Sequence, residues 1–438
     1  MQRLCWHSIR IAALLALCSL PSLALQPVEE FVRGARQRNP DELEARANLS
    51  QNEAQADSAL GRVLPGVTAR GSYGRNQYGS QVDLALPGQP PQTVTLVPKD
   101  QWDGSATLTV PLIDLAGFRR VSAAKTSAQA SAHQLESTRL QVEGEVVQGY
   151  YQLVANLALV DASKTALDVS REGLRLAQAR YRAGTAAALD VDRARADVEQ
   201  QFQQLAAAEL QVALSVRALE STSSVTPDVT AAPPLSDDLH PEPELDAFQT
   251  GLNSLPSVEA ASASTSAARQ EADAQKLALA PVIAGFLTET ATNAAGFAGH
   301  DWSYQAGVAF TWSFDLTNIA DIRARNAGVE AARARELRTR LSAGDAIHRE
   351  WNTVLAGIAR SRSARAGREA AVHASQQARD RYRAGTITQL DLLQAQRDAF
   401  NAEVSRIQAD ADLVNARVQL RLSSGQSLIP DSGRKGTP

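Results

Sequence analysis

The sequence predicts a mainly helical chain made of one unit written twice, in which each unit joins long antiparallel coiled-coil helices to a β-hairpin. Three observations support this fold class. A shift of 201 residues places the motifs of the second half on those of the first. Two stretches alternate apolar and polar residues, as strands do, and the 64 residues 117–180 contain no proline while keeping a period of 3.5.

Composition excludes several classes of function. The chain has 44 Lys+Arg against 48 Asp+Glu, a net charge of −4, so it lacks the basic surface that nucleic-acid binding requires. Both cysteines lie in the first 24 residues, and no two of the six histidines are three or four residues apart. We therefore expect no catalytic residues, no cofactor and no metal site, and the protein is not expected to be an enzyme.

Residues 1–24 have the pattern of a secretory signal. Arg3 and Arg10 precede an apolar stretch, and Ser22-Leu23-Ala24 is a small-x-small cleavage site. We expect cleavage after Ala24 and export from the cytoplasm. The alternative is lipidation at Cys18, which the large residue Leu17 disfavours because the position before a lipidated cysteine is normally small.

The internal repeat divides the rest of the chain. Upstream of the strands the shift becomes 216, so the first copy carries an insertion of about 15 residues between Val67 and Trp102, where residues 86–91 are expected to form an extended loop. The linker is expected to hold one short helix near 246–253. The expected parts are a first repeat at 25–220, a linker at 221–256, a second repeat at 257–422 and a disordered tail at 423–438.

Each repeat is expected to open with a helix, at 41–63 and 257–279, with a proline at either end. Two strands with a period of two follow, most clearly over 302–314 and 105–112. An ordinary half-buried strand is the plainer interpretation, but nothing else in the chain is placed to cover the apolar face, so lipid is favoured. The residues expected to face lipid are Leu108, Val110, Val308, Phe310 and Phe314.

Four strands cannot close a barrel by themselves. The smallest closed membrane barrels have about eight strands, so several copies must contribute to one wall. Three copies would give about twelve strands around a shared lumen. We therefore expect an obligate homotrimer in contact with membrane lipid.

The long helices are expected to form antiparallel hairpins. In the first repeat the helix has apolar residues at alternating spacings of four and three, and the chain returns after Gly184. Gly385 marks the same turn in the second repeat. The heptad positions are Val146, Leu153, Val160, Leu167, Leu174 and Tyr181, and on the return Val191, Val198, Leu205, Val212 and Leu219.

The duplicated order, with Tyr-x-x-Gly-Thr followed by Leu-Asp in both halves, resembles the TolC family of outer-membrane efflux proteins. The resemblance covers nearly all of the chain after the signal and implies a trimeric 12-stranded barrel continuous with a periplasmic helical tunnel in a Gram-negative bacterium. It also implies a periplasmic adaptor and an inner-membrane pump. The family commonly has a second acidic residue where this chain has Gln394, which makes a double acidic ring doubtful.

The hairpin tips are where the resemblance places functional residues. A periplasmic gate is expected at Asp190, Asp391, Tyr382 and Arg383. Adaptor docking is expected at Arg182, Ala183, Gly184, Thr185, Ala384, Gly385 and Thr386.

Each of these residues also has a structural interpretation. The two glycines fit helix C-termini. Thr388 and Asp391 have capping-box spacing, whereas Ala187 takes the place of Thr388 before Asp190, so capping explains Asp190 less well. Arg182 and Arg383 either favour nearby carbonyl groups or bond across helices to hold the tip shut.

Two functions fit these patterns. The favoured one is a passive exit duct of an efflux or type I secretion system, gated at its helical tip. The alternative is a trimeric surface stalk or adhesin with a coiled-coil spacer, which has no need of two strand pairs per chain. The sequence identifies neither the cargo nor whether the pump is driven by protons or by ATP.

Overall fold

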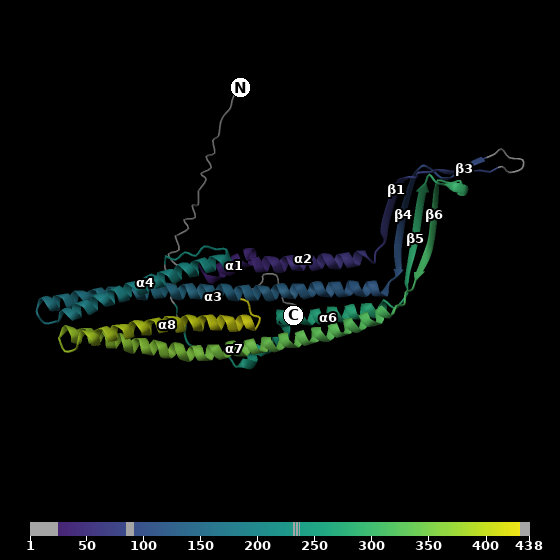
Figure 1. Ribbon diagram of the computed structural model, residues 1–438. Coiled ribbons are helices and arrows are strands. Elements are labelled where there is room, and N and C mark those ends of the chain that lie inside the picture. Colours follow the sequence, from purple (N-terminus) through teal and green to yellow (C-terminus); the bar gives the residue numbers. More distant parts are fainter. Residues whose placement is uncertain (1–24, 85–91, 231–232, 234, 236, 430–438) are drawn as a thin grey trace, which may run out of the picture.

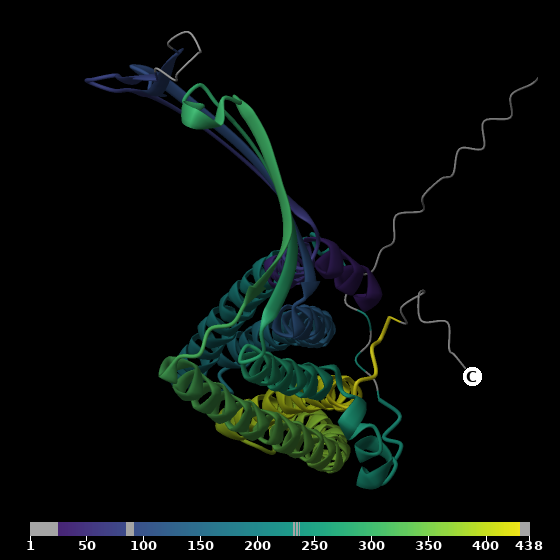
Figure 2. The ribbon, with the colours of Figure 1, turned by 90° about the vertical axis from the view of Figure 1, so that its right-hand side faces the viewer.

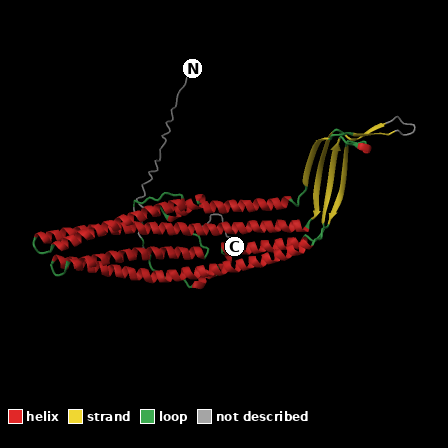
Figure 3. Ribbon diagram, viewed as in Figure 1, coloured by secondary structure: helices red, strands yellow, loops and turns green. Residues whose placement is uncertain are grey.

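The computed structural model describes residues 25–84, 92–230, 233, 235 and 237–429. The expected signal segment with Cys18, the expected loop at 86–91 and the last nine residues of the expected tail lie outside the described residues. The chain is elongated, with a helical bundle at one end and a sheet at the other (Figure 1, Figure 3).

Helices make up most of the chain. No helix in the described part of the chain is long and apolar enough to cross a membrane. The helices are α1 Val28–Arg38, α2 Pro40–Gly61, α3 Leu115–Arg182, α4 Ala188–Ser223, α5 Leu245–Gln249, α6 Pro256–Leu277, α7 Leu316–Arg383 and α8 Gln389–Ser423, with 3-10 turns η1 Leu252–Ser254 and η2 Gly296–Ala298.

The internal repeat is visible in these bounds. Helices α3 and α7 each contain 68 residues, and α4 and α8 contain 36 and 35. A short helix, α2 or α6, precedes the strands of each half and begins at a proline, Pro40 or Pro256, which suits the first helical turn because its backbone lacks an N–H. The fold class predicted from the sequence is confirmed in its helical repeats and hairpins.

Six strands form two sheets in the described residues: β1 Gly66–Arg75, β2 Ser80–Leu84, β3 Gln92–Val97, β4 Asp100–Ile113, β5 Val282–Thr292 and β6 Trp302–Thr311. The larger sheet has the order β1-β4-β5-β6 and is antiparallel throughout. Its four strands run side by side and curve together, and β1 and β6 are its two open edges (Figure 2).

The small β2–β3 sheet corrects the expectation of four strands per chain, because it adds two strands between β1 and β4. Its strands flank the expected loop, and both alternate apolar with polar residues over only five or six positions. A second correction concerns Phe314, which lies beyond the end of β6 at Thr311. There the chain leaves the sheet, because Asp315 accepts a hydrogen bond from the Thr317 N–H and begins α7.

The core lies at the middle of the bundle and has one part for each repeat. The first part packs Phe31 of α1 against Leu153 of α3 and Leu219 of α4. The second packs Ile347 of α7 against Leu413 of α8, with Phe248 of α5 at its edge. The expected short helix in the linker is therefore α5, which covers the second core.

The predicted heptad positions of α3 are buried or half-buried as far as Leu174. Val146, Leu153 and Leu167 of α3 are buried, but Tyr181 is 51% exposed. The seam ends before Tyr181 because the return helix α4 begins only at Ala188, so nothing from this hairpin covers the last turn of α3.

The expected tail is partly packed. A disordered tail was expected from residue 423, yet Leu428 and Ile429 pack against the first core, and the buried Glu143 carboxylate accepts hydrogen bonds from the Leu428 N–H and the Ser427 hydroxyl. This contact could not be read from the sequence, because the carboxylate that holds residues 427–429 lies about 285 residues earlier in the chain.

Candidate functional site

The two hairpin tips lie together at the end of the molecule farthest from the strands (Figure 1). Each tip turns at a glycine in the left-handed region, Gly184 with φ +77° and Gly385 with φ +81°. In both turns the N–H of the following threonine donates back into the helix, from Thr185 to the Arg180 carbonyl at 2.9 Å and from Thr386 to the Arg381 carbonyl at 3.0 Å. These hydrogen bonds make the glycines helix C-terminal residues, as the structural interpretation predicted.

The seven residues expected to dock an adaptor are on this surface. Arg182, Gly184 and Thr185 are exposed on one tip, and Gly385 and Thr386 on the other. Ala183 and Ala384, which precede the glycines, are exposed as well.

Asp391 closes a complete capping box at the start of α8. Its N–H donates to the Thr388 hydroxyl at 3.2 Å, and its carboxylate accepts from the Thr388 N–H at 3.0 Å and from the Thr388 hydroxyl at 2.7 Å. The hydrogen bond from the Thr388 hydroxyl lowers the pKa of Asp391 most, and the bond from the Thr388 N–H lowers it further. The side chain nevertheless stays exposed to solvent and ionised.

Asp190 has a weaker version of the same arrangement. Its carboxylate accepts from the Ala187 N–H at 3.4 Å and lies 3.9 Å from the Arg193 guanidinium. Alanine offers no hydroxyl in return, so half of the capping box is missing, as the sequence indicated. The carboxylate of Asp190 is therefore held less firmly than that of Asp391.

Arg180 joins the two tips, and sequence reasoning missed it. Its guanidinium donates to the Tyr382 carbonyl and lies 4.6 Å from the centre of the Tyr382 ring. Tyr382 is only 3% exposed, and burial raises the pKa of its phenol, whose hydroxyl has no hydrogen-bond partner among the described residues. The bond across the helices was expected of Arg182 or Arg383.

Neither of those two arginines forms a hydrogen bond between the hairpins among the described residues of one protomer. The pKa of Glu172 on α3, which its hydrogen bond with Arg175 lowers most, is lowered further by the positive charge of Arg383. Arg383 lies 3.8 Å from Asp380 of its own helix, and Arg182 is exposed. A usable signal was present, because Arg180 is one turn before Gly184 and a basic residue there can reach across the tip. The choice between three neighbouring arginines depends on the rotation of α3 about its axis, which the sequence pattern does not fix.

A second contact joins the hairpins one to two helical turns further from the tips. Arg397 of α8 lies 3.4 Å from the Asp197 carboxylate and 3.3 Å from the Gln200 side chain of α4. Asp197 is 4% exposed, and burial raises its pKa although Arg397 acts in the opposite direction. This contact was not predicted.

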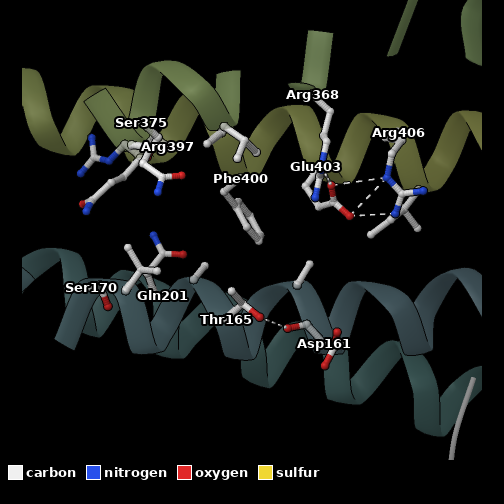
Figure 4. A pocket seen from close by; sticks show the side chains of 18 of the residues that line it. Asp161, Thr165, Ser170, Gln201, Arg368, Ser375, Arg397, Phe400, Glu403 and Arg406 are labelled. Atoms are coloured by element: carbon white, nitrogen blue, oxygen red, sulfur yellow. Dashed lines mark hydrogen bonds and ion pairs between the residues drawn. The ribbon is translucent and has the colours of Figure 1, made fainter. Parts of the chain in front are cut away.

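Next to this contact, on the side away from the tips, a cavity of about 490 Å³ lies between the hairpins and is lined by α3, α4, α7 and α8. Phe400 points into it, Gln201 faces it from α4, and the Arg368 and Arg406 guanidiniums bond the Glu403 carboxylate at its far end (Figure 4). Further along, the hairpins meet again where Ala155 of α3 packs against Ile407 and Ala411 of α8. The two hairpins thus contact each other at both ends of the cavity.

The acidic cluster Asp237, Asp238 and His240 in the linker has metal-ligating atoms within 4.8 Å of one another. It does not suit a cation, because the buried Arg417 guanidinium already contacts two of its three residues, 2.8 Å from the Asp237 carboxylate and 2.9 Å from the His240 ring. Arg417 is also hydrogen-bonded to Glu242 and to the His240 carbonyl. This network fastens the linker to α8.

The apolar face of the large sheet is exposed on β6 at Val308, 67%, and Phe310, 66%. Leu108 and Val110 are half-buried on β4, which β5 separates from β6. Thr107 and Thr288 share a hydrogen bond of 3.1 Å on the opposite face. The strands therefore present an apolar and a polar face, as their alternation predicted.

Comparison with known proteins agrees with this architecture. The family described as outer membrane efflux protein matches residues 32–223 and 248–426. No curated protein matches the chain. Among solved structures, the fold is similar to the outer membrane protein VceC of Vibrio cholerae, with 18% identity, a TM-score of 0.76, and coverage of 92% of this chain and 97% of that one.

Two further structures are similar over the same extent. The open state of the MtrE outer membrane channel of Neisseria gonorrhoeae has 18% identity and a TM-score of 0.73, covering 93% of this chain and 91% of that one. The CmeC outer membrane channel of Campylobacter jejuni has 19% identity and a TM-score of 0.73, covering 91% and 85%.

Proposed function

The chain belongs to the outer membrane efflux protein family, and on that premise we propose that three copies form a passive duct closed at the periplasmic end by its hairpin tips. Family membership makes it an outer membrane efflux channel of a tripartite system in a Gram-negative bacterium, with a periplasmic helical tunnel, and not an enzyme. The proposal adds the number of copies, the residues of the gate and the docking of partners.

Trimer formation follows from the sheet. One chain provides four strands with two open edges, and β1 and β6 leave unpaired N–H and C=O groups along their outer sides. Three of the larger sheets joined edge to edge give about twelve strands and pair both open edges, β1 and β6, of each copy. The exposed Val308 and Phe310 then face lipid.

The gate is carried by Asp190 and Asp391 at the helix starts, supported by Tyr382, with Arg383 beside it. In a trimer the three copies of each aspartate lie around one axis, where they attract cations and raise one another's pKa. Arg180 holds Tyr382, and with it the α7–α8 tip, against the α3–α4 tip. Release of this contact would let the hairpins separate around the cavity.

The exposed tips are the surface offered to a partner. We infer that Arg182 to Thr185 and Ala384 to Thr386 contact a periplasmic adaptor, which links the duct to an inner-membrane pump. Their exposure at the far end of the bundle and the identical geometry of the two turns support this role.

The observation that carries the gate is the pair of contacts from Arg180 to Tyr382, and planar-bilayer recording tests it. The double variant Tyr382→Phe with Arg383→Ser keeps the aromatic ring that Arg180 contacts and tests the contribution of the Arg383 side chain to the closed state. Arg180→Gln instead removes the contact between the hairpins. We expect Arg180→Gln to raise single-channel conductance and to let large antibiotics enter cells, and a conductance equal to that of the wild type would overturn the assignment.

Asp391→Ala tests the acidic ring. We expect a loss of cation preference, while the matched control Asp398→Ala, an exposed aspartate two turns further along α8, leaves it unchanged. If Asp391→Ala lowers only the melting temperature and leaves conductance and selectivity intact, capping is its whole role and the ring should be dropped from the gate.

A further inference from the structure

We propose that neighbouring protomers recognise one another through a charge-complementary seam, in which the exposed face of α7 of one protomer lies against the exposed face of α2 of the next. This inference rests on the proposed trimer, and it specifies which surfaces meet and what aligns them. For brevity, these two faces are called the α7–α2 seam.

The order of the elements defines the two edges that must meet. Near the strands the helices contact one another in the order α2, α3, α6, α7, and the sheet has the parallel order β1, β4, β5, β6. α2 leads into β1 and α7 follows β6, so one edge of the protomer carries α2 with β1 and the other carries α7 with β6 (Figure 1, Figure 2). Head-to-tail repetition around an axis joins these unlike edges and closes a ring.

On α7, small side chains lie on the face turned away from α6, where they permit the close approach of another helix. Residues spaced by seven, Ile322, Val329 and Glu336, are buried or half-buried, and Arg325 on the same side lies 3.6 Å from Glu271 of α6. The opposite face carries exposed alanines at positions 320, 324, 327, 331 and 334.

α2 has the same construction. Its inward positions are Glu42, Leu49 and Ala56, again spaced by seven and buried or half-buried against α3. The outward side carries exposed small residues at positions 47, 54 and 58. Two faces of small residues let helix axes approach to about 8 Å, which brings the longer flanking side chains of the two helices within reach of each other.

The flanking charges have opposite signs. α2 contains five carboxylates and one arginine, whereas the first 26 residues of α7, 316–341, contain six arginines and three carboxylates. Four of these carboxylates and four of these arginines are exposed and have no ion-pair partner among the described residues of their own protomer. They are Asp41, Glu44, Glu53 and Asp57 on α2 and Arg323, Arg335, Arg338 and Arg340 on α7.

Exposed leucines indicate how α2 and α7 of neighbouring protomers are aligned along their axes. Leu43 of α2 is 48% exposed, and Leu337 and Leu341 of α7 are 57% and 59% exposed. Counted from the strand end of each helix at about 1.5 Å per residue, Leu43 lies about 27 Å away and Leu337 about 32 Å away. An antiparallel α7–α2 pair therefore brings these apolar side chains together, farther from the strands than the small residues of the two faces.

A charge-swap experiment tests the seam. We expect Glu44→Arg with Asp57→Arg, and separately Arg323→Glu with Arg335→Glu, to lower the fraction of trimer in detergent extracts by about tenfold, as native mass spectrometry measures it. The four changes together should restore the trimer. The control Glu244→Arg with Asp246→Arg makes the same change in charge on two exposed residues at α5 and should leave the trimer unchanged.

Cysteine pairs provide a second test that does not depend on stability. The chain after residue 24 contains no cysteine, so Ala54→Cys with Ala324→Cys and Ala47→Cys with Ala331→Cys each introduce the only pair. We expect oxidation to give covalent dimers and trimers for both pairs and none for the single variants.

The outcomes separate the seam from the trimer. A trimeric wild type whose charge variants stay trimeric, or whose fourfold variant is no better than the double variants, overturns the seam and leaves the proposed function standing. Absence of crosslinks in a trimeric protein also overturns it. A wild type that is monomeric in detergent contradicts the proposed function itself.

Discussion

Asp197 is a carboxylate whose burial opposes its ionisation. Burial raises its pKa, and Arg397 only partly offsets this effect. A carboxyl group with a higher pKa in the folded state binds protons more readily when folded, so the free energy of unfolding falls as pH rises from the ordinary pKa, about 3.9, to the raised one, and stays low above it.

Substitutions at this pair should therefore be unequal at neutral pH. We expect Asp197→Asn to raise the melting temperature above that of the wild type and to flatten its dependence on pH above about 4. Arg397→Ala should destabilise by about 1–3 kcal/mol, because it leaves the buried carboxylate without a cation. Thermal unfolding followed by circular dichroism measures both, with exposed Glu199→Gln as the control, and equal destabilisation by the two variants would refute the assignment.

For single residues, the sequence predicts hydrogen bonds within one helical turn better than contacts between distant segments. The capping spacing of Thr388 and Asp391 was sufficient to predict their hydrogen bonds, because both groups lie within one turn of helix. The contact of Arg180 with Tyr382 spans 202 residues and depends on the relative rotation of two hairpins. Local spacing contains no information on that rotation, so Arg182 and Arg383 were predicted in its place.

At the scale of single elements, α3 is fastened to both ends of the chain by Glu143. Its fully buried carboxylate lies 3.2 Å from the Arg36 guanidinium of α1 and accepts from the Ser427 hydroxyl and the Leu428 N–H. We expect Glu143→Ala to lower the free energy of unfolding by about 1–3 kcal/mol, since it leaves the Leu428 N–H and the Ser427 hydroxyl without this acceptor.

Limited proteolysis checks this prediction at the chain's end. Cleavage after residue 423 should become much faster in Glu143→Ala and stay slow in the control Glu145→Ala, an exposed position on the same helix. Equal cleavage rates in the two variants would mean that Glu143 does not hold residues 427–429.

The sheet provides an element-scale test of membrane insertion. Val308 is 67% exposed and lies in the middle of β6, opposite Gly285 of β5. We expect Val308→Lys to disfavour insertion by about 2–4 kcal/mol near the bilayer midplane. Folding into lipid vesicles measures the effect, Ser303→Lys on the polar face is the control, and an equal effect of the two changes would contradict the assignment of the faces.

Helices and main strands could be predicted because their periods extend over many residues. The 3.5 period of α3 is followed by burial at Val146, Leu153 and Leu167, and the alternation over 302–311 is β6. The strands β2 and β3 were missed because five or six residues with Gln, Asp and Thr give too short a pattern. Phe314 continued the alternation after the strand had ended, because periodicity does not register the start of the α7 cap.

At the scale of the whole molecule, duplication gives one chain two similar halves. The two repeats place two nearly identical hairpins side by side, and their tips share the same turn hydrogen bonds. The contacts between them are not duplicated, because Arg180 and Asp197 of the first repeat meet Tyr382 and Arg397 of the second in one direction only. The repeat alone therefore did not predict these contacts between the hairpins.

The most direct test of a trimeric duct closed at its hairpin tips is the electron cryo-microscopy structure of the wild-type protein in lipid nanodiscs. We expect a threefold particle with one continuous lumen, lipid around Val308 and Phe310, α7 of each protomer against α2 of the next, and the narrowest point at the tips near Asp391. A particle with another number of protomers, or a lumen whose narrowest point lies away from the hairpin tips, would contradict it.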